Sequence, residues 1–182
     1  MPRVFLSLGS NLGDRLALLR RAVELLAQVP GVRFLEASGL YETEPWDTVA
    51  GEIVDRARWF LNCVVAIETS LPPATLLVEV QGIEGVLGRI RSDAAPEAER
   101  AEPRTMDIDI LLYGDRVISV PDDLQIPHLF LHERAFVLRP LAELAPDLEH
   151  PVLYRTMSEL LAELKDDHQV IASELPRRWF LR

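Results

Sequence analysis

The order in which strand-like and helix-like apolar patterns follow one another restricts the possible folds of this chain most strongly. Four segments have the composition of buried strands, at residues 4–8, 32–41, 59–69 and 105–113. Two segments have apolar side chains at intervals of three and four, the spacing of a helix that buries one face, at residues 16–26 and 76–90. The predicted order is therefore strand, helix, strand, strand, helix, strand.

This order is typical of an α+β fold with the ferredoxin-like βαββαβ layout, in which two helices cover one face of an antiparallel sheet. A short strand is predicted at 116–120, and further helical segments at 131–144 and after Thr156, where Thr156 and Glu159 fit a capping box. We find neither an internal repeat nor a linker. The 182 residues are therefore expected to form a single domain with a C-terminal helical extension.

The charge balance argues against a general nucleic-acid-binding protein. The chain has 19 basic and 29 acidic residues, so its formal net charge is −10, whereas affinity for a phosphate backbone rests on excess Lys and Arg. Lys165 is the only lysine and does not follow a glycine-rich turn, which excludes a P-loop. A polyanionic small ligand would need a local cluster of arginines, or metal ions.

The sequence contains no signal for a membrane or for export. No stretch approaches the roughly 20 apolar residues that span a bilayer, and residues 1–8 lack the pattern of a signal peptide. We therefore expect no membrane partner and a cytoplasmic location. The single cysteine, Cys63, lies in an apolar run and is expected in the core.

A pair of acidic residues on a predicted strand is the strongest local sign of chemistry. Asp107 and Asp109 point to one face of the strand, with Cα atoms about 7 Å apart, while Met106, Ile108, Ile110 and Leu112 are expected to fill the opposite, core face. Carboxylates at that spacing can share Mg²⁺ ions whose other ligands are phosphate and water. Arg104 lies upstream, as in sites that neutralise charge during phosphoryl transfer. The alternative is a half-buried strand that shows its acids to solvent.

Several other polar residues allow both a structural and a functional interpretation. Arg89 and Arg91 end the second helix, where cations also favour the helix dipole. His128 follows a proline turn and could bind phosphate or be an incidental surface residue. Asn62 lies inside an apolar strand, so it needs hydrogen-bond partners, either a heterocyclic ligand or the backbone.

Taken together, these segments resemble the 6-hydroxymethyl-7,8-dihydropterin pyrophosphokinases of folate biosynthesis. The resemblance runs from about residue 3 to about 152, so residues 153–182 form the extension. It rests on segments 9–14 (GSNLGD), 41–45 (YETEP), 60–62 (FLN), 88–91 (GRIR), 103–111 (PRTMDIDIL), 126–128 (IPH) and 132–138 (HERAFVL).

The resemblance implies transfer of the β,γ-diphosphate of ATP to the hydroxymethyl group of 6-hydroxymethyl-7,8-dihydropterin, with release of AMP. It implies two Mg²⁺ ions on Asp107 and Asp109, and catalytic roles for these carboxylates together with Arg89 and Arg104. The ATP-binding positions would be Gln81, Glu84, Arg89, Arg91, Arg104, Ile110 and His128. The pterin-binding positions would be Thr43, Pro45, Trp46, Phe60, Asn62 and Phe136.

Some features depart from the family pattern. Many members have Trp-Gly before the Pro-Arg-Thr segment, where this chain has Ala101 and Glu102. The loop before it is longer and more acidic, and the connection from Trp46 to Phe60 is extended. The tail from Gln169 lies outside the resemblance and is expected to cover the core rather than bind a partner.

Three other functions remain open from the sequence. A non-catalytic binding module of the same fold would not need the acidic pair and should not bind ATP-Mg²⁺. An RNA-binding module is disfavoured by the charge and because the predicted strands lack the combined aromatic and basic signature of such modules. A relative that acts on another alcohol would keep the metal and nucleotide residues. We expect a monomer, with a dimer as the alternative.

Overall fold

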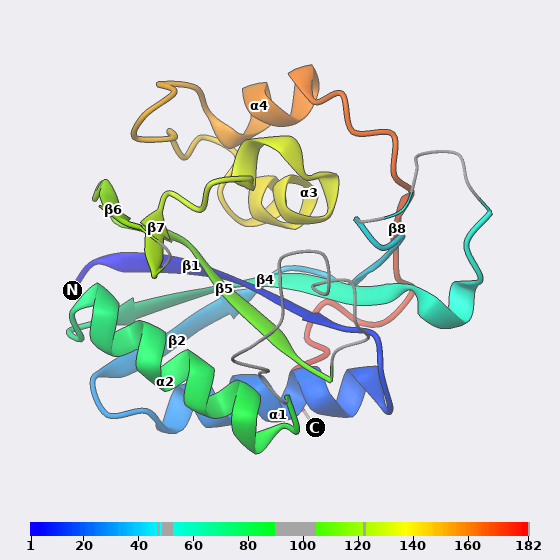
Figure 1. Ribbon diagram of the computed structural model, residues 1–182, viewed down its shortest axis with the longest axis horizontal. Helices are drawn as coiled ribbons and strands as arrows, with labels where there is room; N and C mark the ends of the chain where they lie inside the picture. The colour runs from blue at the N-terminus through cyan, green and yellow to red at the C-terminus, as the bar shows by residue number, and fades with distance from the viewer. Residues whose placement is uncertain (47, 49–52, 90–104, 122, 182) are drawn as a thin grey trace.

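The computed structural model describes residues 1–46, 48, 53–89, 105–121 and 123–181 (Figure 1). The strands are β1 (Arg3–Ser10), β2 (Val32–Ala37), β3 (Tyr41–Thr43), β4 (Phe60–Thr69), β5 (Asp107–Tyr113), β6 (Ile118–Val120), β7 (Leu124–Ile126) and β8 (Val170–Ala172). The helices are α1 (Arg15–Gln28), α2 (Pro73–Val86), α3 (Ala135–Leu144) and α4 (Met157–Glu163), with single 3₁₀ turns at Arg56–Arg58 and Leu131–Glu133. The predicted α+β class is confirmed.

The main sheet is antiparallel and has β1 and β4 at its centre. Its strands lie in the order β5-β1-β4-β3-β8, and β2 also pairs with β4. Strands β6 and β7 form a separate two-stranded ribbon. The two longest strands thus lie side by side and carry neighbours on both edges.

The strand predicted over 32–41 is divided into β2 and β3. Residues 38–40 separate the two strands, and there the side-chain oxygen of Ser38 accepts a hydrogen bond from Val64 N at 3.0 Å, while Ser38 N donates to Val64 O at 2.9 Å. Both pieces still pair with β4. The apolar pattern does not reveal this break, because it depends on a hydrogen bond between distant residues.

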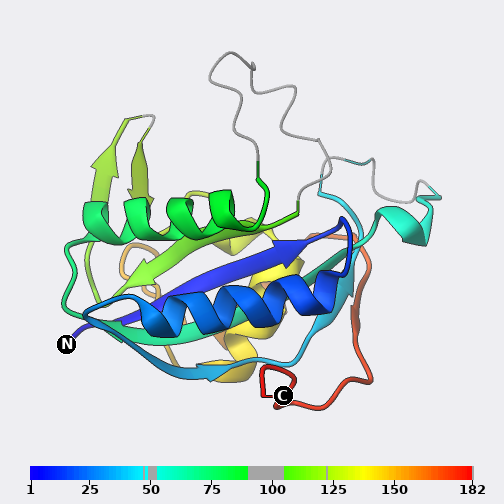
Figure 2. The same ribbon diagram turned by 90° about the horizontal axis from the view of Figure 1, so that it is seen from below.

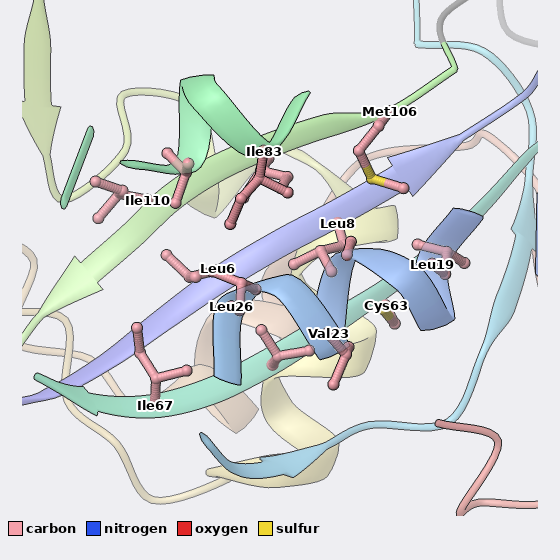
Figure 3. Close-up of a cluster of buried hydrophobic side chains, with 14 of the residues drawn as sticks. Leu6, Leu8, Leu19, Val23, Leu26, Cys63, Ile67, Ile83, Met106 and Ile110 are labelled. Carbon is pink, nitrogen blue, oxygen red and sulfur yellow. The ribbon is translucent and has the colours of Figure 1, made fainter. Parts of the chain in front are cut away.

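Helices cover both faces of the sheet. Figure 2 shows α1 and α2 in front of the sheet and α3 behind it. A large apolar cluster fills the layer between the sheet and α1 and α2, and Figure 3 draws part of it, including Leu6, Leu8, Leu19, Val23, Leu26, Cys63, Ile67, Ile83, Met106 and Ile110. A second cluster joins the opposite face to α3 and α4. Cys63 is fully buried, as predicted.

Local signals explain where the two core helices begin and end. The Asp14 carboxylate accepts a hydrogen bond from Ala17 N at 3.0 Å and so caps α1. Pro73 starts α2, where a missing N–H costs nothing. This helix ends at Val86, earlier than the predicted residue 90, because Gly88 turns the chain with a φ of 88°. Arg89 therefore follows the helix, and Arg91 lies outside the described residues.

A bulge in β5 changes which side chains face the main core. The pairing of β1 with β5 shifts between Phe5 and Leu6, so Leu6 lies opposite Ile110 but Phe5 lies opposite Leu112. Leu112 therefore packs in the cluster under α3, and its predicted place beside Ile110 is wrong. The bulge inserts one residue and so reverses the alternation beyond it. Asp107 and Asp109 precede the bulge and keep their predicted common face.

The C-terminal tail folds back over the core. Strand β8 pairs with β3, and Trp179 is 1% exposed within the main apolar cluster. The indole N–H of Trp179 donates to the Ser38 carbonyl at 2.8 Å, and Arg20 donates to the Trp179 carbonyl at 2.6 Å. The expectation that the tail covers the core is confirmed. Within the described ranges, no helix is both long and apolar enough to cross a membrane.

Candidate active site

The acidic pair lies at the start of β5, on the face of the sheet away from α1 and α2. Between the two carboxylates, the side chain of Ile108 points into the main core. Burial, together with the negative charge of Asp107, raises the pKa of Asp109 to about 7. The fold thus places two carboxylates close together, so a cation beside them would stabilise their ionised form.

Arg89 supplies such a charge from the turn after α2. Its guanidinium forms ion pairs with the carboxylates of both Asp107 and Glu84. Burial alone would lower the pKa of Arg89, but the two carboxylates outweigh it and raise that pKa. Glu84 is fully buried, and its carboxylate accepts a hydrogen bond from Ile108 N at 2.8 Å. Glu84 therefore ties the end of α2 to β5 and holds Arg89 beside the acidic pair.

A row of residues crosses the sheet from the acidic pair to a buried amide. Gly9 in β1 lies opposite Asp107 on one side and opposite Asn62 on the other. Neighbouring strands are about 4.8 Å apart, so Asp107 and Asn62 lie about 10 Å apart on the same face. Residue 9 must be small, because a Cβ atom there would approach the Asn62 amide oxygen to 2.3 Å.

The amide of Asn62 is oriented by Thr43. Both side chains are buried, and Asn62 Nδ2 donates to Thr43 Oγ1 at 2.7 Å. Phe60 lies opposite Thr43 in the pairing of β3 with β4 and is partly exposed. Pro45 is buried directly after β3. Four of the predicted pterin-binding residues thus gather at one end of β3 and β4.

The other two predicted pterin-binding residues face each other across the start of α3. The rings of Trp46 and Phe136 pack edge to face with centroids 6.4 Å apart. The guanidinium of Arg134 lies beside both rings, 5.3 Å from the Trp46 centroid and 5.7 Å from the Phe136 centroid. Burial and, secondly, the charge of Arg134 lower the pKa of His128, and the same charge offsets part of the rise in the pKa of Asp109.

Arg134 is a site residue that the sequence analysis did not assign. Its segment is part of the family resemblance, but an arginine before a helix gives no sign of its neighbours. Its position between Trp46, Phe136 and Asp109 depends on how the loop after β3 packs against α3. The sequence contained one signal: Arg134 is the only arginine or lysine in segment 132–138, which also contains the predicted pterin-binding residue Phe136.

His128 lies near the acidic pair in a neutral state. Burial and the nearby charge of Arg134 lower its pKa to about 4. Its backbone N–H donates to the Leu111 carbonyl at 2.9 Å, and its Nδ1 accepts from Phe130 N at 3.3 Å. With Nδ1 as an acceptor, the ring carries its proton on Nε2, which can donate to an anion.

The remaining predicted ATP-binding residues differ in their exposure. Gln81 lies on α2, one turn before Glu84, and is partly exposed. The side chain of Ile110 is 4% exposed and packs in the main core, so only its backbone can contact a ligand (Figure 3). Arg91 and Arg104 lie outside the described residues.

The acidic pair fits a hard divalent cation. Carboxylate oxygens are the donors that Mg²⁺ prefers, and it usually takes one or two of them together with phosphate and water. Among the described residues, no group of three or more His, Cys, Asp or Glu side chains could hold a metal. An ion on Asp107 and Asp109 would therefore need further oxygen ligands from a substrate.

One face of this α+β fold thus combines a charged half, around Asp107 and Arg89, with an amide-and-aromatic half, around Asn62 and Trp46, a combination that suits a transferase. Residues 5–146 match the family model of 7,8-dihydro-6-hydroxymethylpterin-pyrophosphokinase. The chain belongs to this family.

Curated relatives agree with this membership. The chain is 45% identical over 164 residues to a 2-amino-4-hydroxy-6-hydroxymethyldihydropteridine pyrophosphokinase of Methylorubrum extorquens, covering 90% of this chain and 94% of the relative. It is 42% identical to the folic acid synthesis protein fol1 of Schizosaccharomyces pombe, covering 88% of this chain but 20% of that protein. The second relative is therefore much longer than this chain.

A solved structure shares the fold. The crystal structure of Plasmodium falciparum HPPK-DHPS with SDX-DHP superimposes with a TM-score of 0.63 at 18% identity, over 90% of this chain. This chain spans 43% of the length of that protein.

Proposed function

We propose that this chain transfers the β,γ-diphosphate of ATP to the hydroxymethyl group of 6-hydroxymethyl-7,8-dihydropterin. In this reaction the alcohol oxygen attacks the β-phosphorus. The bond between the β-phosphorus and the oxygen that bridges it to the α-phosphorus breaks, and AMP leaves with that oxygen. The alcohol proton passes to solvent. The observation that carries the proposal is the row Asp107, Gly9 and Asn62, which sets the acidic pair and the buried amide on one face of the sheet.

The acidic pair is proposed to bind ATP together with two Mg²⁺ ions. Asp107 and Asp109 would hold the ions, which supply charge neutralisation on the phosphate chain when bound. Arg89 forms an ion pair with Asp107, and its guanidinium would contact a phosphate bound beside that carboxylate. Arg104 and Arg91 are proposed as further phosphate-binding residues, and neutral His128 as a donor from Nε2.

The nucleoside part of ATP is proposed to lie along the end of α2 and the edge strand β5. Gln81 is partly exposed there, while Glu84 acts through its bonds to Arg89 and Ile108 N. Ile110 would contribute its backbone, because its side chain is buried.

The pterin is proposed to bind at the other end of the row. Asn62, oriented by Thr43, would read the amide edge of the ring, next to the buried Pro45. Phe60, Trp46 and Phe136 would supply aromatic faces to the flat ring system. Diphosphoryl transfer needs little covalent help from the protein, so positioning and charge neutralisation would supply most of the rate.

We also propose that the chain is one domain of the ferredoxin-like layout and acts as a monomer in the cytoplasm. The layout is supported by the order β5-β1-β4-β2, with α1 and α2 on one face. The described elements outside this layout include β3, the β6–β7 ribbon, α3, α4 and β8.

Variants of the acidic pair test the proposal. Asp107→Asn and Asp109→Asn keep the side-chain shape but weaken binding of a divalent ion, so turnover with ATP and Mg²⁺ should fall by at least about a hundredfold. The matched control is Asp115→Asn, since Asp115 is exposed in the turn after β5. Excess EDTA should abolish the wild-type rate.

Near-normal turnover of either variant would remove that residue from the metal role. A folded wild-type chain that binds ATP with Mg²⁺ but leaves the pterin unchanged would indicate another acceptor alcohol. Failure to bind ATP with Mg²⁺ would indicate a non-catalytic module.

A further inference from the structure

A short segment between α4 and β8 runs beside the loop that carries Trp46. This segment, Asp166 to Gln169, lies beyond residues 5–146 that match the family model. In Figure 1 the chain after α4 descends along one side of the molecule before it enters β8. The two segments are joined by hydrogen bonds from both sides of Pro45.

Asp166 connects this segment to the start of α3. Its Oδ2 accepts a hydrogen bond from Ala135 N at 2.7 Å, and its Oδ1 accepts one from His168 N at 3.0 Å. Ala135 is the first residue of α3 and directly precedes Phe136. Asp166 therefore satisfies a backbone N–H that the helix itself leaves unpaired, and it fixes the start of the helix that carries Phe136.

His168 connects the same carboxylate to the Trp46 loop. Its Nδ1 lies 2.6 Å from Asp166 Oδ1, and its Nε2 lies 3.0 Å from the Thr48 carbonyl. Its ring also packs on Trp46 with centroids 5.2 Å apart. Thr48 closes a turn on Pro45, since its hydroxyl donates to the Pro45 carbonyl at 2.7 Å. The imidazole of His168 thus packs against the ring of Trp46 and also forms a hydrogen bond with the turn that follows Trp46.

Both partners of the His168 ring are acceptors. A carboxylate and a carbonyl can each only receive a hydrogen bond, so both ring nitrogens must donate, as they do in the protonated ring. Burial alone would lower the pKa of His168, but the bonds to Asp166 and Thr48 and the charge of Glu44 outweigh it and raise that pKa.

Gln169 completes the connection on the other side of Pro45. Its backbone N–H and side-chain amide donate to the Glu44 carboxylate at 2.8 and 3.2 Å, and Glu44 N donates to the Gln169 carbonyl at 3.1 Å. Glu44, on one side of the Pro45–Trp46 pair, and Thr48, on the other, are therefore both attached to the tail.

We propose that His168, held by Asp166, is a positioning residue for the acceptor alcohol: it fixes Trp46 relative to Phe136 and so sets the width of the aromatic half of the site. This inference rests on the proposed placement of the pterin at Trp46 and Phe136. Among the described residues, the side chain of His168 contacts Asp166, Thr48 and Trp46, so its role concerns acceptor binding and is expected to leave ATP binding unchanged.

Steady-state kinetics of the full chain test this role. In His168→Ala, the KM for 6-hydroxymethyl-7,8-dihydropterin should rise about tenfold, the factor that corresponds to about 1.4 kcal/mol and to the loss of a charge-assisted hydrogen bond. The KM for ATP and kcat should stay within about twofold of wild type. His168→Gln, whose Nε2 can still donate to the Thr48 carbonyl, should recover part of the loss.

Two controls make the result specific. Asp167→Asn changes an exposed acid in the same segment and should leave both KM values unchanged. Phe136→Ala tests the pterin placement itself and should raise the KM for the pterin. Circular dichroism of each variant should match the wild-type spectrum.

The outcomes separate the two claims. If Phe136→Ala raises the pterin KM but His168→Ala does not, the positioning role is overturned and the pterin site stands. If neither variant changes it, the pterin site is overturned and the positioning role with it. Equal rises of both KM values in His168→Ala would point to a general structural role and also overturn the inference.

Discussion

Gly9 separates Asp107 from Asn62 on one face of the sheet, and its lack of a side chain is what leaves the Asn62 amide room. A Cβ atom at residue 9 would lie 2.3 Å from Asn62 Oδ1, which is far inside contact distance. An alanine would therefore push the amide away from Thr43 and from its place above the sheet.

Gly9→Ala should consequently raise the KM for the pterin alcohol by about tenfold or more while the KM for ATP changes little. The matched control is Gly82→Ala on α2, where an added Cβ meets nothing within 4 Å. That control should keep both KM values and increase the free energy of unfolding by about 0.5–1 kcal/mol. An unchanged pterin KM in Gly9→Ala would remove Asn62 from acceptor recognition.

The sequence was sufficient to predict the acidic pair but not its surroundings. Alternation along a strand places Asp107 and Asp109 on one face without knowledge of the rest of the fold. Arg134 reaches the site only because the loop after β3 packs against α3, and this packing leaves no periodic signal. Arg89 and the ring pair of Trp46 and Phe136 were assigned to the site by the family resemblance and not by a pattern along the chain, whereas Arg134 was assigned by neither.

At the scale of elements, the tail segment after α4 should give the protein a measurable pH dependence. The folded-state pKa of His168 is raised above the ordinary value of 6.5, and the groups that raise it are Asp166, the Thr48 carbonyl and Glu44. Protonated His168 therefore stabilises the folded state, and this stabilisation is complete below about pH 6.5. It is lost as the pH rises through the folded-state pKa.

The difference in free energy of unfolding between wild type and His168→Gln should therefore be larger at about pH 6 than at about pH 9. Urea titrations of both proteins at the two pH values measure this difference. A difference that does not change with pH would contradict a protonated His168 in the folded state.

The positions of the elements were largely predictable, and their interruptions were not. The intervals of three and four apolar residues correctly indicate α1 and α2 because each helix buries one face. The break at Ser38 and the bulge in β5 arise from pairing with other strands. Neither is visible in the residues of the affected strand, so the strand at 32–41 and the place of Leu112 were predicted wrongly.

At the scale of the whole molecule, Trp179 joins the end of the chain to the core beneath β2 and α1. Trp179→Ala should lower the free energy of unfolding by about 3–5 kcal/mol, because it removes a fully buried aromatic side chain. Trp179→Phe keeps most of the volume but loses the hydrogen bond to the Ser38 carbonyl, so it should cost less, about 1–2 kcal/mol.

Denaturant unfolding followed by circular dichroism measures both values. Losses below about 1 kcal/mol in Trp179→Ala would mean that the tail does not contribute to the core in solution.

In the proposed reaction, both terminal phosphates of ATP pass to one alcohol as a unit. ³¹P nuclear magnetic resonance of a reaction containing the chain, ATP, Mg²⁺ and 6-hydroxymethyl-7,8-dihydropterin distinguishes this transfer from that of a single phosphate. We expect one new single resonance for AMP and one new pair of mutually coupled resonances for a diphosphate ester, with neither formed by Asp107→Asn. Formation of ADP with a phosphate ester that shows one uncoupled resonance would contradict it.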